Sequence, residues 1–242
     1  SLGPPTKESL NHLIDFVDNK WAKLLVRGWN EDNWISKPIS IGDRIATLVG
    51  AQKGSIIVGD TLSIKTYQAL FSAIKLQRNR KIVLSDSGNF PSDLYIAKGL
   101  IDSLKSGYQL KLVEPEEVMN ALNDEVAVLF LSEVDYRTSR KHNMAELTKQ
   151  AKKVGALTIW DIAHSVGILD LALEKVDIDF AVGCTYKYLN GGPGSPAFLY
   201  AAPRLQNNID NPIKGWLGHS SPFAFKKKYK PEKWISKIGR KD

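Results

Sequence analysis

The 242-residue sequence contains one cysteine, Cys184, and lacks any apolar run of roughly eighteen residues, the length that crosses a bilayer. A single thiol excludes an internal disulfide, and the missing apolar run excludes a membrane-spanning helix. Residues 1–5 have neither the charged segment nor the apolar segment of a secretion signal. We therefore expect a soluble protein of the cytoplasm, a reducing compartment, with no membrane partner.

Signatures of several functional classes are also missing. The sequence has no Gly-x-Ser-x-Gly turn and no Walker-type phosphate loop, which excludes two large classes of enzyme. His142, His164 and Cys184 are not spaced as metal ligands, so we expect no metal site. The formal charge is +7, with lysines at positions 226–228, 230 and 233, but no signature of nucleic-acid recognition accompanies them. We interpret this basic run as a solvated surface and expect no nucleic-acid partner.

The first fifty residues have a helical pattern. Thr6 follows two prolines and is a typical N-cap residue. Apolar residues then recur at helical spacing, which predicts a helix with one apolar stripe that needs a partner surface. The stripe consists of Leu10, Leu13, Ile14, Val17, Trp21, Leu24 and Leu25. A loop over residues 29–38 and a short helix through Ile41, Ile45 and Leu48 are expected to follow.

From residue 54 onward, short apolar runs alternate with helical segments. Uninterrupted apolar runs are typical of strands that are buried on both faces. Their alternation with helices predicts an α/β domain, with about seven strands in a mostly parallel sheet and helices on both faces. The last connection has no helical pattern, so its two strands could be antiparallel. The runs cover residues 55–58, 81–84, 110–113, 126–131, 157–160, 178–182 and 197–200.

Two residues with the chemistry that pyridoxal phosphate requires follow neighbouring strands of this predicted sheet. Asp161 comes directly after the run 157–160, and Lys187 comes after the run 178–182. The cofactor needs a lysine amine for its Schiff base and a carboxylate that keeps its ring nitrogen protonated, so that the ring can accept electrons. A solvated salt bridge between two strand ends is the alternative, and the spacing alone does not separate the two interpretations.

The loop after Lys187 contains four consecutive residues that break helices, at positions 191–194. A tight turn between two strands explains this composition. A backbone that approaches a flat cofactor closely explains it as well. In that case a desolvated Lys187 would have a lowered pKa, which suits Schiff-base chemistry.

A phosphate group would find backbone N–H donors at the N-terminus of a helix, where the helix dipole also favours negative charge. Residues 59–63 offer such a place between the first strand and a helix, although Thr61 or Ser63 could simply cap that helix. Phe90 lies at another junction between a strand and a helix and could supply an aromatic platform. A role in the core is the alternative for Phe90.

Together these segments resemble the kynureninase family. The resemblance extends from residue 1 to about residue 225. Its longest segments are 160–167, 182–198 and 215–219, and supporting segments are 1–3, 29–34, 89–93 and 135–138. It implies the large domain of a fold-type-I pyridoxal-phosphate enzyme related to class-V aminotransferases. It also implies a homodimer with active sites at the subunit interface, which hydrolyses L-kynurenine or its 3-hydroxy form to anthranilate or 3-hydroxyanthranilate and L-alanine in tryptophan catabolism.

The resemblance assigns a role to each matching position. Lys187 would hold the cofactor and move the α-proton, and Tyr186 would donate a proton or anchor the phosphate. Asp161 would pair with the ring nitrogen, and Phe90 would stack on the ring. The remaining cofactor-binding positions would be Leu62, Ser63, Pro91, Ser92, Asp93, His164 and Trp216.

The sequence departs from the family pattern at Lys65, where asparagine is usual, and at Ser139, where glycine is usual. It also lacks most of the family's C-terminal small domain. We therefore expect a helical N-terminal segment (1–50), a cofactor-binding large domain (51–225), and a basic tail or the start of the small domain (226–242). Two alternatives remain: a cysteine desulfurase or other class-V relative, and a fragment that binds the cofactor without activity. Desulfurases typically have His before the lysine and a reactive cysteine after it, whereas this chain has Tyr186 and no later cysteine.

Overall fold

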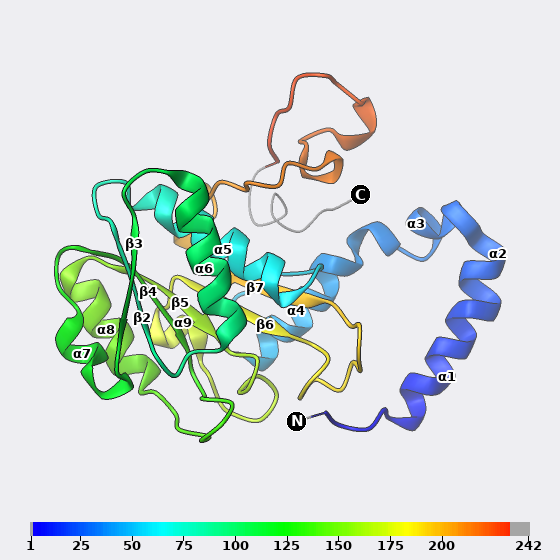
Figure 1. The fold of residues 1–242 in the computed structure, drawn as a ribbon. Helices are drawn as coiled ribbons and strands as arrows, with labels where there is room; N and C mark the ends of the chain where they lie inside the picture. Colours follow the sequence, from blue (N-terminus) through cyan, green and yellow to red (C-terminus); the bar gives the residue numbers. More distant parts are fainter. Residues whose placement is uncertain (1, 233–242) are drawn as a thin grey trace.

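A computed structural model of the chain describes residues 2–232. Within these residues, the centre of the fold is a seven-stranded sheet with the order β1-β7-β6-β5-β4-β2-β3 (Figure 1). All seven predicted strands are confirmed. They are β1 (Ile56–Val58), β2 (Ile82–Asp86), β3 (Gln109–Val113), β4 (Val126–Ser132), β5 (Leu157–Asp161), β6 (Phe180–Cys184) and β7 (Ala197–Ala201).

The sheet is mostly parallel, as the sequence predicts. Strands β2 to β6 pair only in parallel with one another, whereas β7 runs antiparallel to both β6 and β1. The connection from β6 to β7 contains no helix, and a chain that returns without a crossover segment forms an antiparallel pair. β1 runs in the same direction as β6, so the loops after β1, β4, β5 and β6 all leave the edge of the sheet that is formed by the carboxyl ends of these strands. This edge is distinct from the lateral edges, which are β1 and β3.

Helices cover both faces of the sheet (Figure 1). Residues of α5 and α6 pack against one face, and residues of α4, α7, α8 and α9 pack against the other, so the sheet lies between two apolar clusters. This arrangement confirms the predicted α/β class, with helices on both faces of a mostly parallel sheet. The helices of this layer are α4 (Lys37–Leu48), α5 (Leu62–Leu76), α6 (Pro91–Leu104), α7 (Val118–Ala121), α8 (Met144–Val154) and α9 (Leu173–Val176).

The expectation that every strand is buried on both faces is wrong for β3. This strand lies at the edge of the sheet and pairs only with β2, and Leu112 on it is 46% exposed. An edge strand has a neighbour on one side only. The other edge strand, β1, is nevertheless buried because α4 packs against it, whereas β3 has less helix cover.

The N-terminal residues form a helical arm that extends away from the sheet (Figure 1). Thr6 caps α1 (Lys7–Asp15) as predicted, with its hydroxyl accepting from Ser9 N at 3.1 Å. The predicted continuous helix is interrupted, because residues 16–21 form a π-helical segment before α2 (Ala22–Leu24). There Phe16 packs on Trp34 at 5.4 Å and Lys20 pairs with Asp32 at 2.7 Å. No residue of α1, the π-helical segment or α2 is buried.

The predicted loop over residues 29–38 contains two short helical turns, α3 (Gly28–Glu31) and a 3₁₀ turn at residues 34–36. Helix α4 then joins the core through Ile45 and Ala46. Across residues 2–232, no helix is both long enough and apolar enough to cross a membrane. The domain boundaries at residues 50 and 225 stay predictions. Lys233, the last lysine of the basic run, lies outside the described residues.

Candidate active site

The loops that follow β5 and β6 bring the two predicted key residues to one edge of the sheet. Asp161 ends β5 and is in register with Ser132 on β4 and with Val182 on β6. Lys187 lies in the loop that follows β6. Both side chains are buried, with 2% of Asp161 and 8% of Lys187 exposed. The structure therefore places the carboxylate and the amine in a protected environment rather than in a solvated salt bridge.

His164 contacts Lys187 directly. Lys187 Nζ lies 2.8 Å from His164 Nε2, and because an ammonium can only donate, the imidazole nitrogen accepts. Burial, and then the positive charge of Lys187, lowers the pKa of His164 to about 4. At neutral pH His164 is therefore a neutral acceptor. It holds the Lys187 amine 5.7 Å from the centre of the Phe90 ring.

Asp93 and Asp161 form a second buried group. Asp93 is 1% exposed, and its Oδ2 has no hydrogen-bond partner among the described residues. Burial, and then the charge of Asp161, raises the pKa of Asp93 well above its ordinary value. Burial also raises the pKa of Asp161, although Ala163 N donates to Asp161 Oδ1 at 2.7 Å. Two neighbouring carboxyl groups are thus buried, and one of their oxygens lacks a donor within the described part of the chain.

Phe90 lies at the N-terminus of α6, where Pro91, Ser92 and Asp93 form the first turn. Its position depends on Asn89, which is 4% exposed. Asn89 Oδ1 accepts from Phe90 N and from Ser132 Oγ, each at 2.7 Å, and thereby ties the loop after β2 to the end of β4. The Phe90 ring packs edge-on against Tyr136 at 5.1 Å and lies 6.3 Å from the His164 ring.

Asn89 and Tyr136 were not among the predicted site residues. Both lie in segments that carry the sequence resemblance, which was the only signal that could have identified them. Their positions depend on hydrogen bonds and ring contacts between loops that are more than forty residues apart in the chain.

Cys184 ends β6, and Tyr186 directly precedes Lys187 in the loop that follows. Tyr186 is partly buried, and burial raises the pKa of its phenol. Lys187 Nζ lies 5.5 Å from the centre of the Tyr186 ring. Cys184 is 1% exposed, and burial raises the pKa of its thiol, so the thiol stays protonated at neutral pH.

The N-terminus of α5, with Leu62 and Ser63 in its first turn, lies beside the loop that contains Lys187. Gly59 N donates to Ala197 O at 2.8 Å, and Ala197 N donates to Asp60 O at 2.9 Å. These bonds join the loop after β1 to the start of β7, where the glycine-rich loop ends. Thr61 caps α5 and accepts from Ile64 N at 3.4 Å, while Ser63 is exposed. The first backbone N–H groups of α5 are therefore available at the same edge as Lys187.

The sequence matches the profile of the family described as "Aminotransferase class-V" over residues 44–220. This match covers most of the chain, including the sheet, the loops at its edge and every site residue described above. The chain belongs to the class-V aminotransferase family.

Within this family, the chain is similar to curated kynureninases. It is 41% identical over 242 residues to the kynureninase of Pseudomonas fluorescens and 40% identical over 243 residues to that of Burkholderia pseudomallei (strain 1106a). Each comparison covers 98% of this chain and 58% of the relative. The chain therefore spans a little over half the length of the curated relatives it matches.

Solved structures of other proteins share the fold. A cysteine desulfurase from Thermococcus onnurineus NA1 has a TM-score of 0.78 and 17% sequence identity, and the match covers 98% of this chain and 60% of that chain. A structure titled NifS-like protein has a TM-score of 0.72 and 16% identity, with 98% of this chain and 65% of that chain covered. At this identity the likeness establishes the fold alone.

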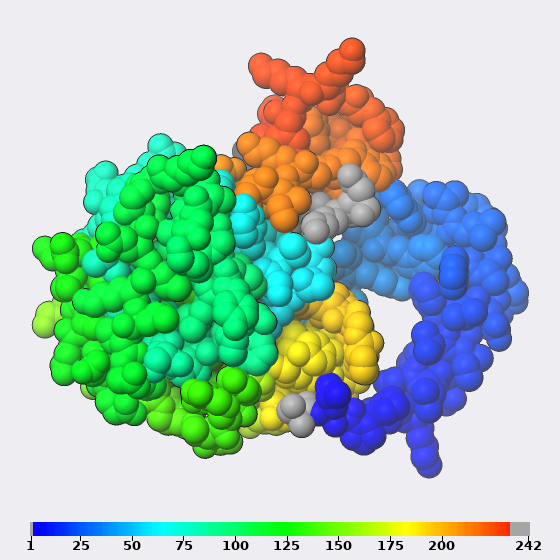
Figure 2. All heavy atoms as spheres, in the orientation of Figure 1, coloured from blue at the N-terminus to red at the C-terminus, as the bar shows by residue number. Residues whose placement is uncertain are grey.

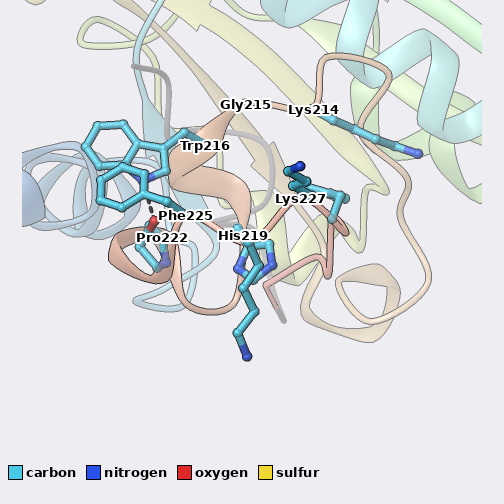
Figure 3. A pocket seen from close by; sticks show the side chains of 9 residues that line it. Lys214, Gly215, Trp216, His219, Pro222, Phe225 and Lys227 are labelled. Carbon is cyan, nitrogen blue, oxygen red and sulfur yellow. Dashed lines mark hydrogen bonds between the residues drawn. The ribbon is translucent and has the colours of Figure 1, made fainter.

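One predicted residue of the class-V aminotransferase site, Trp216, is not brought together with Lys187. Its ring lies 5.8 Å from the ring of Trp29. Figure 3 shows that it also stacks on Phe225, at 5.5 Å, and that its Nε1 donates to Pro222 O, at 2.5 Å. Trp29 belongs to the N-terminal arm, whereas Trp216, Pro222 and Phe225 belong to the segment that leaves the sheet after β7, shown in orange and red in Figure 1. There they line a pocket of about 540 Å³ together with Lys214, Lys226 and Lys227.

His142, which the sequence excluded as a metal ligand, has a different partner. Its Nε2 lies 2.6 Å from Asp86 Oδ2 in a buried contact, and Arg140 Nη2 lies 3.6 Å from the same oxygen. This group ties the end of β2 to the loop after β4. The sequence did not predict the contact of His142 and Arg140 with Asp86, and its one indication was that Asp86 lies at the end of a strand.

Proposed function

We propose that the chain carries the cofactor site of a pyridoxal-phosphate-dependent hydrolase that converts L-kynurenine to anthranilate and L-alanine. The 3-hydroxy form of kynurenine is a second substrate of the same class. The observation that carries the proposal is the buried group of Lys187, His164, Asp161 and Asp93, in a chain 41% identical to a curated kynureninase. The reaction belongs to tryptophan catabolism, and we place it in the cytoplasm.

The residues at the sheet edge fit pyridoxal phosphate. The cofactor would supply an electron-accepting ring and a carbonyl that reacts with amines. Its protonated ring nitrogen would give the buried pair of Asp93 and Asp161 a donor and a compensating positive charge. Its phosphate would accept from the first N–H groups of α5 near Leu62 and Ser63. Phe90 would cover one face of the ring.

The side chains around Lys187 support a role in proton transfer. His164 is neutral and accepts from Lys187 Nζ, so the amine is held at a fixed position 2.8 Å from an acceptor. Lys187 is well placed to remove and return the α-proton of a bound amino acid. The Tyr186 phenol, whose pKa is raised, keeps its proton at neutral pH and is the candidate donor during carbon–carbon cleavage.

We infer that the protein works as a homodimer with active sites at the subunit interface. One observation that supports this inference is the apolar stripe on the arm, where Leu13 is 60% and Ile14 is 61% exposed. Figure 2 shows the arm in blue, with open space between it and the rest of the chain. The second is the packing of Trp216 against Trp29 and Phe225 rather than against Lys187, which suits a role in the site of the partner rather than in that of its own chain.

A cysteine desulfurase is the nearest alternative, because solved structures of that activity share the fold. Such an enzyme needs an accessible thiolate that receives sulfur. Cys184 is the one cysteine of these 242 residues, and it is buried with a raised pKa. The site therefore favours the hydrolase.

The proposal is tested with the absorption spectrum of the full chain after addition of pyridoxal phosphate. The expected result is a visible band that borohydride reduction removes, present in the Lys175→Ala control and absent in Lys187→Ala. Lys175 is an exposed residue of α9. L-Kynurenine is then added and anthranilate fluorescence is recorded, with sulfide release from L-cysteine as the competing reaction. A chain that shows no lysine-dependent band, or that releases sulfide and no anthranilate, would overturn the proposal.

A further inference from the structure

Lys65, the residue at which the chain departs from its family's usual asparagine, is a fully buried lysine. Its side chain is 0% exposed and lies near the start of α5. Lysine is almost never fully buried unless its charge is paired. The Lys65 ammonium has such a partner, because Nζ lies 3.2 Å from Asp60 Oδ2, and a further 3.2 Å contact joins it to Gln68 Oε1.

Asp60 occupies a critical place in the loop that leads into α5. It has a left-handed backbone conformation, with φ of 58°, directly before the capping residue Thr61. Its carbonyl accepts from Ala197 N, at the end of the glycine-rich loop. The direction in which the first N–H groups of α5 point therefore depends on how Asp60 is held.

The same network continues to the segment that carries Trp216. Gln68 Nε2 donates to Asn211 Oδ1 at 3.2 Å, and Asn211 Oδ1 also accepts from Ile213 N at 3.0 Å. Ser72, one turn further along α5, donates to Asp210 O at 2.8 Å. Gln68 is 0% and Asn211 is 6% exposed, so these bonds form away from solvent, where an unpaired polar group is costly.

We propose that Lys65 is a positioning residue that, through its buried ion pair with Asp60, fixes the α5 N-terminus in the geometry that binds the cofactor phosphate. The proposal rests on the proposed function, because it assumes that this N-terminus receives a phosphate. Lys65 acts through Asp60 and not on the phosphate itself, since the Asp60 carboxylate already neutralises its charge. Removal of the lysine alone takes this cation away from the partly buried Asp60 carboxylate, which favours a rearranged loop.

The test compares Lys65→Gln with the double variant Asp60→Asn, Lys65→Gln in the full chain. Dissociation constants are measured for pyridoxal phosphate and for pyridoxal, which lacks the phosphate, with Lys75→Gln on the exposed side of α5 as the matched control. We expect the single variant to bind pyridoxal phosphate about tenfold more weakly, as after the loss of one charge-assisted contact. The double variant recovers most of that loss, because two amides replace the ion pair without a residual charge. Pyridoxal binding is unchanged throughout.

Each other outcome has a definite meaning. If the double variant is as weak as the single variant, the charge of Lys65 acts on the phosphate directly and the positioning role is overturned. If pyridoxal affinity falls as much as pyridoxal phosphate affinity, the effect is not on the phosphate loop and the inference is again overturned.

Wild-type-like binding by Lys65→Gln overturns this inference and leaves the proposed function intact. A wild-type chain with no Lys187-dependent band overturns the proposed function instead. Melting temperatures of the ligand-free variants identify any variant that fails to fold, and Lys65→Met then replaces Lys65→Gln.

Discussion

At the scale of single residues, the burial of His164 beside Lys187 predicts a specific pH dependence of stability. The pKa of His164 is about 4 in the folded chain, below its ordinary value of 6.5. As the pH falls from 6.5 to 4, the unfolded chain binds a proton that the folded chain does not, so this histidine lowers the free energy of unfolding. As the pH falls through this window, we expect the free energy of unfolding of His164→Gln to rise relative to that of wild type. Above pH 6.5, the difference between the two should stay constant. Melting temperatures measured from pH 4 to 8 provide the check, and parallel curves would contradict the assignment.

The buried carboxyl group of Asp93 predicts the opposite dependence. Its pKa is raised above the ordinary 3.8, so stability is lost as the pH rises from that value through the folded pKa. In the ligand-free chain, Asp93→Asn is expected to be more stable than wild type at pH 7, by about 1–3 kcal/mol, the usual cost of a buried unsatisfied polar group. The difference should close near pH 4. Urea unfolding of variant and wild type at both pH values measures this difference, and a difference of equal size at pH 7 and pH 4 would argue against a buried carboxyl group with a raised pKa.

Sequence reasoning located Lys187, Asp161 and the loop at residues 59–63 because each follows a recognisable strand, and parallel strands place their carboxyl ends at one edge. It could not anticipate the contact between Lys187 and His164, since that distance depends on how two loops fold over each other. It also grouped Trp216 with the cofactor-binding positions, without indicating which chain's site that residue serves. Trp216 follows β7 after a long segment that has neither helical nor strand periodicity. Without such periodicity, the sequence does not predict where the segment runs relative to the sheet.

At the scale of whole elements, the packing of α4 on β1 depends on one glycine. A Cβ atom at Gly42 would lie 2.2 Å from the carbonyl oxygen of Ile56. Gly42→Ala is therefore expected to push α4 away from the sheet and to lower the free energy of unfolding by about 1–3 kcal/mol, as overpacking does. Gly99→Ala on α6 is the matched control, because no atom lies within 4 Å of its added Cβ. The control should be about 0.5–1 kcal/mol more stable than wild type, the gain of alanine over glycine in a helix. Equal effects of the two substitutions in denaturant unfolding would contradict this account.

The strands were predictable as elements because a short apolar run between turn residues is typical of a buried strand in a chain that alternates such runs with helical segments. The exposure of β3 was not predictable, because the order of strands in the sheet determines which strand lies at the edge, and a single sequence does not contain that order. The arm shows the same limit. Its apolar stripe predicted a helix that needs a partner surface, and within the described residues that stripe stays exposed.

At the scale of the whole molecule, the exposed stripe on the arm and the position of Trp216 both fit the homodimer that we propose. A dimer interface that buries the stripe gains hydrophobic stabilisation from side chains such as Leu13, which is 60% exposed in the single chain. By two-fold symmetry, whatever Trp216 of one chain reaches in its partner is also reached in return. The two features are therefore consistent with one interface.

This arrangement predicts complementation between two inactive variants. Lys187→Ala and Trp216→Ala are each expected to have little activity alone. When they are unfolded together and refolded as a mixture, half of the dimers contain one chain of each kind. In these, one site combines the intact Lys187 of one chain with the intact Trp216 of the other, so activity should recover to about a quarter of the wild-type value. If Trp216 instead serves its own chain, every site in the mixed dimer lacks one of the two residues and no recovery is possible. Anthranilate fluorescence of the mixture, compared with each variant refolded alone, therefore separates a shared site from a site contained in one chain.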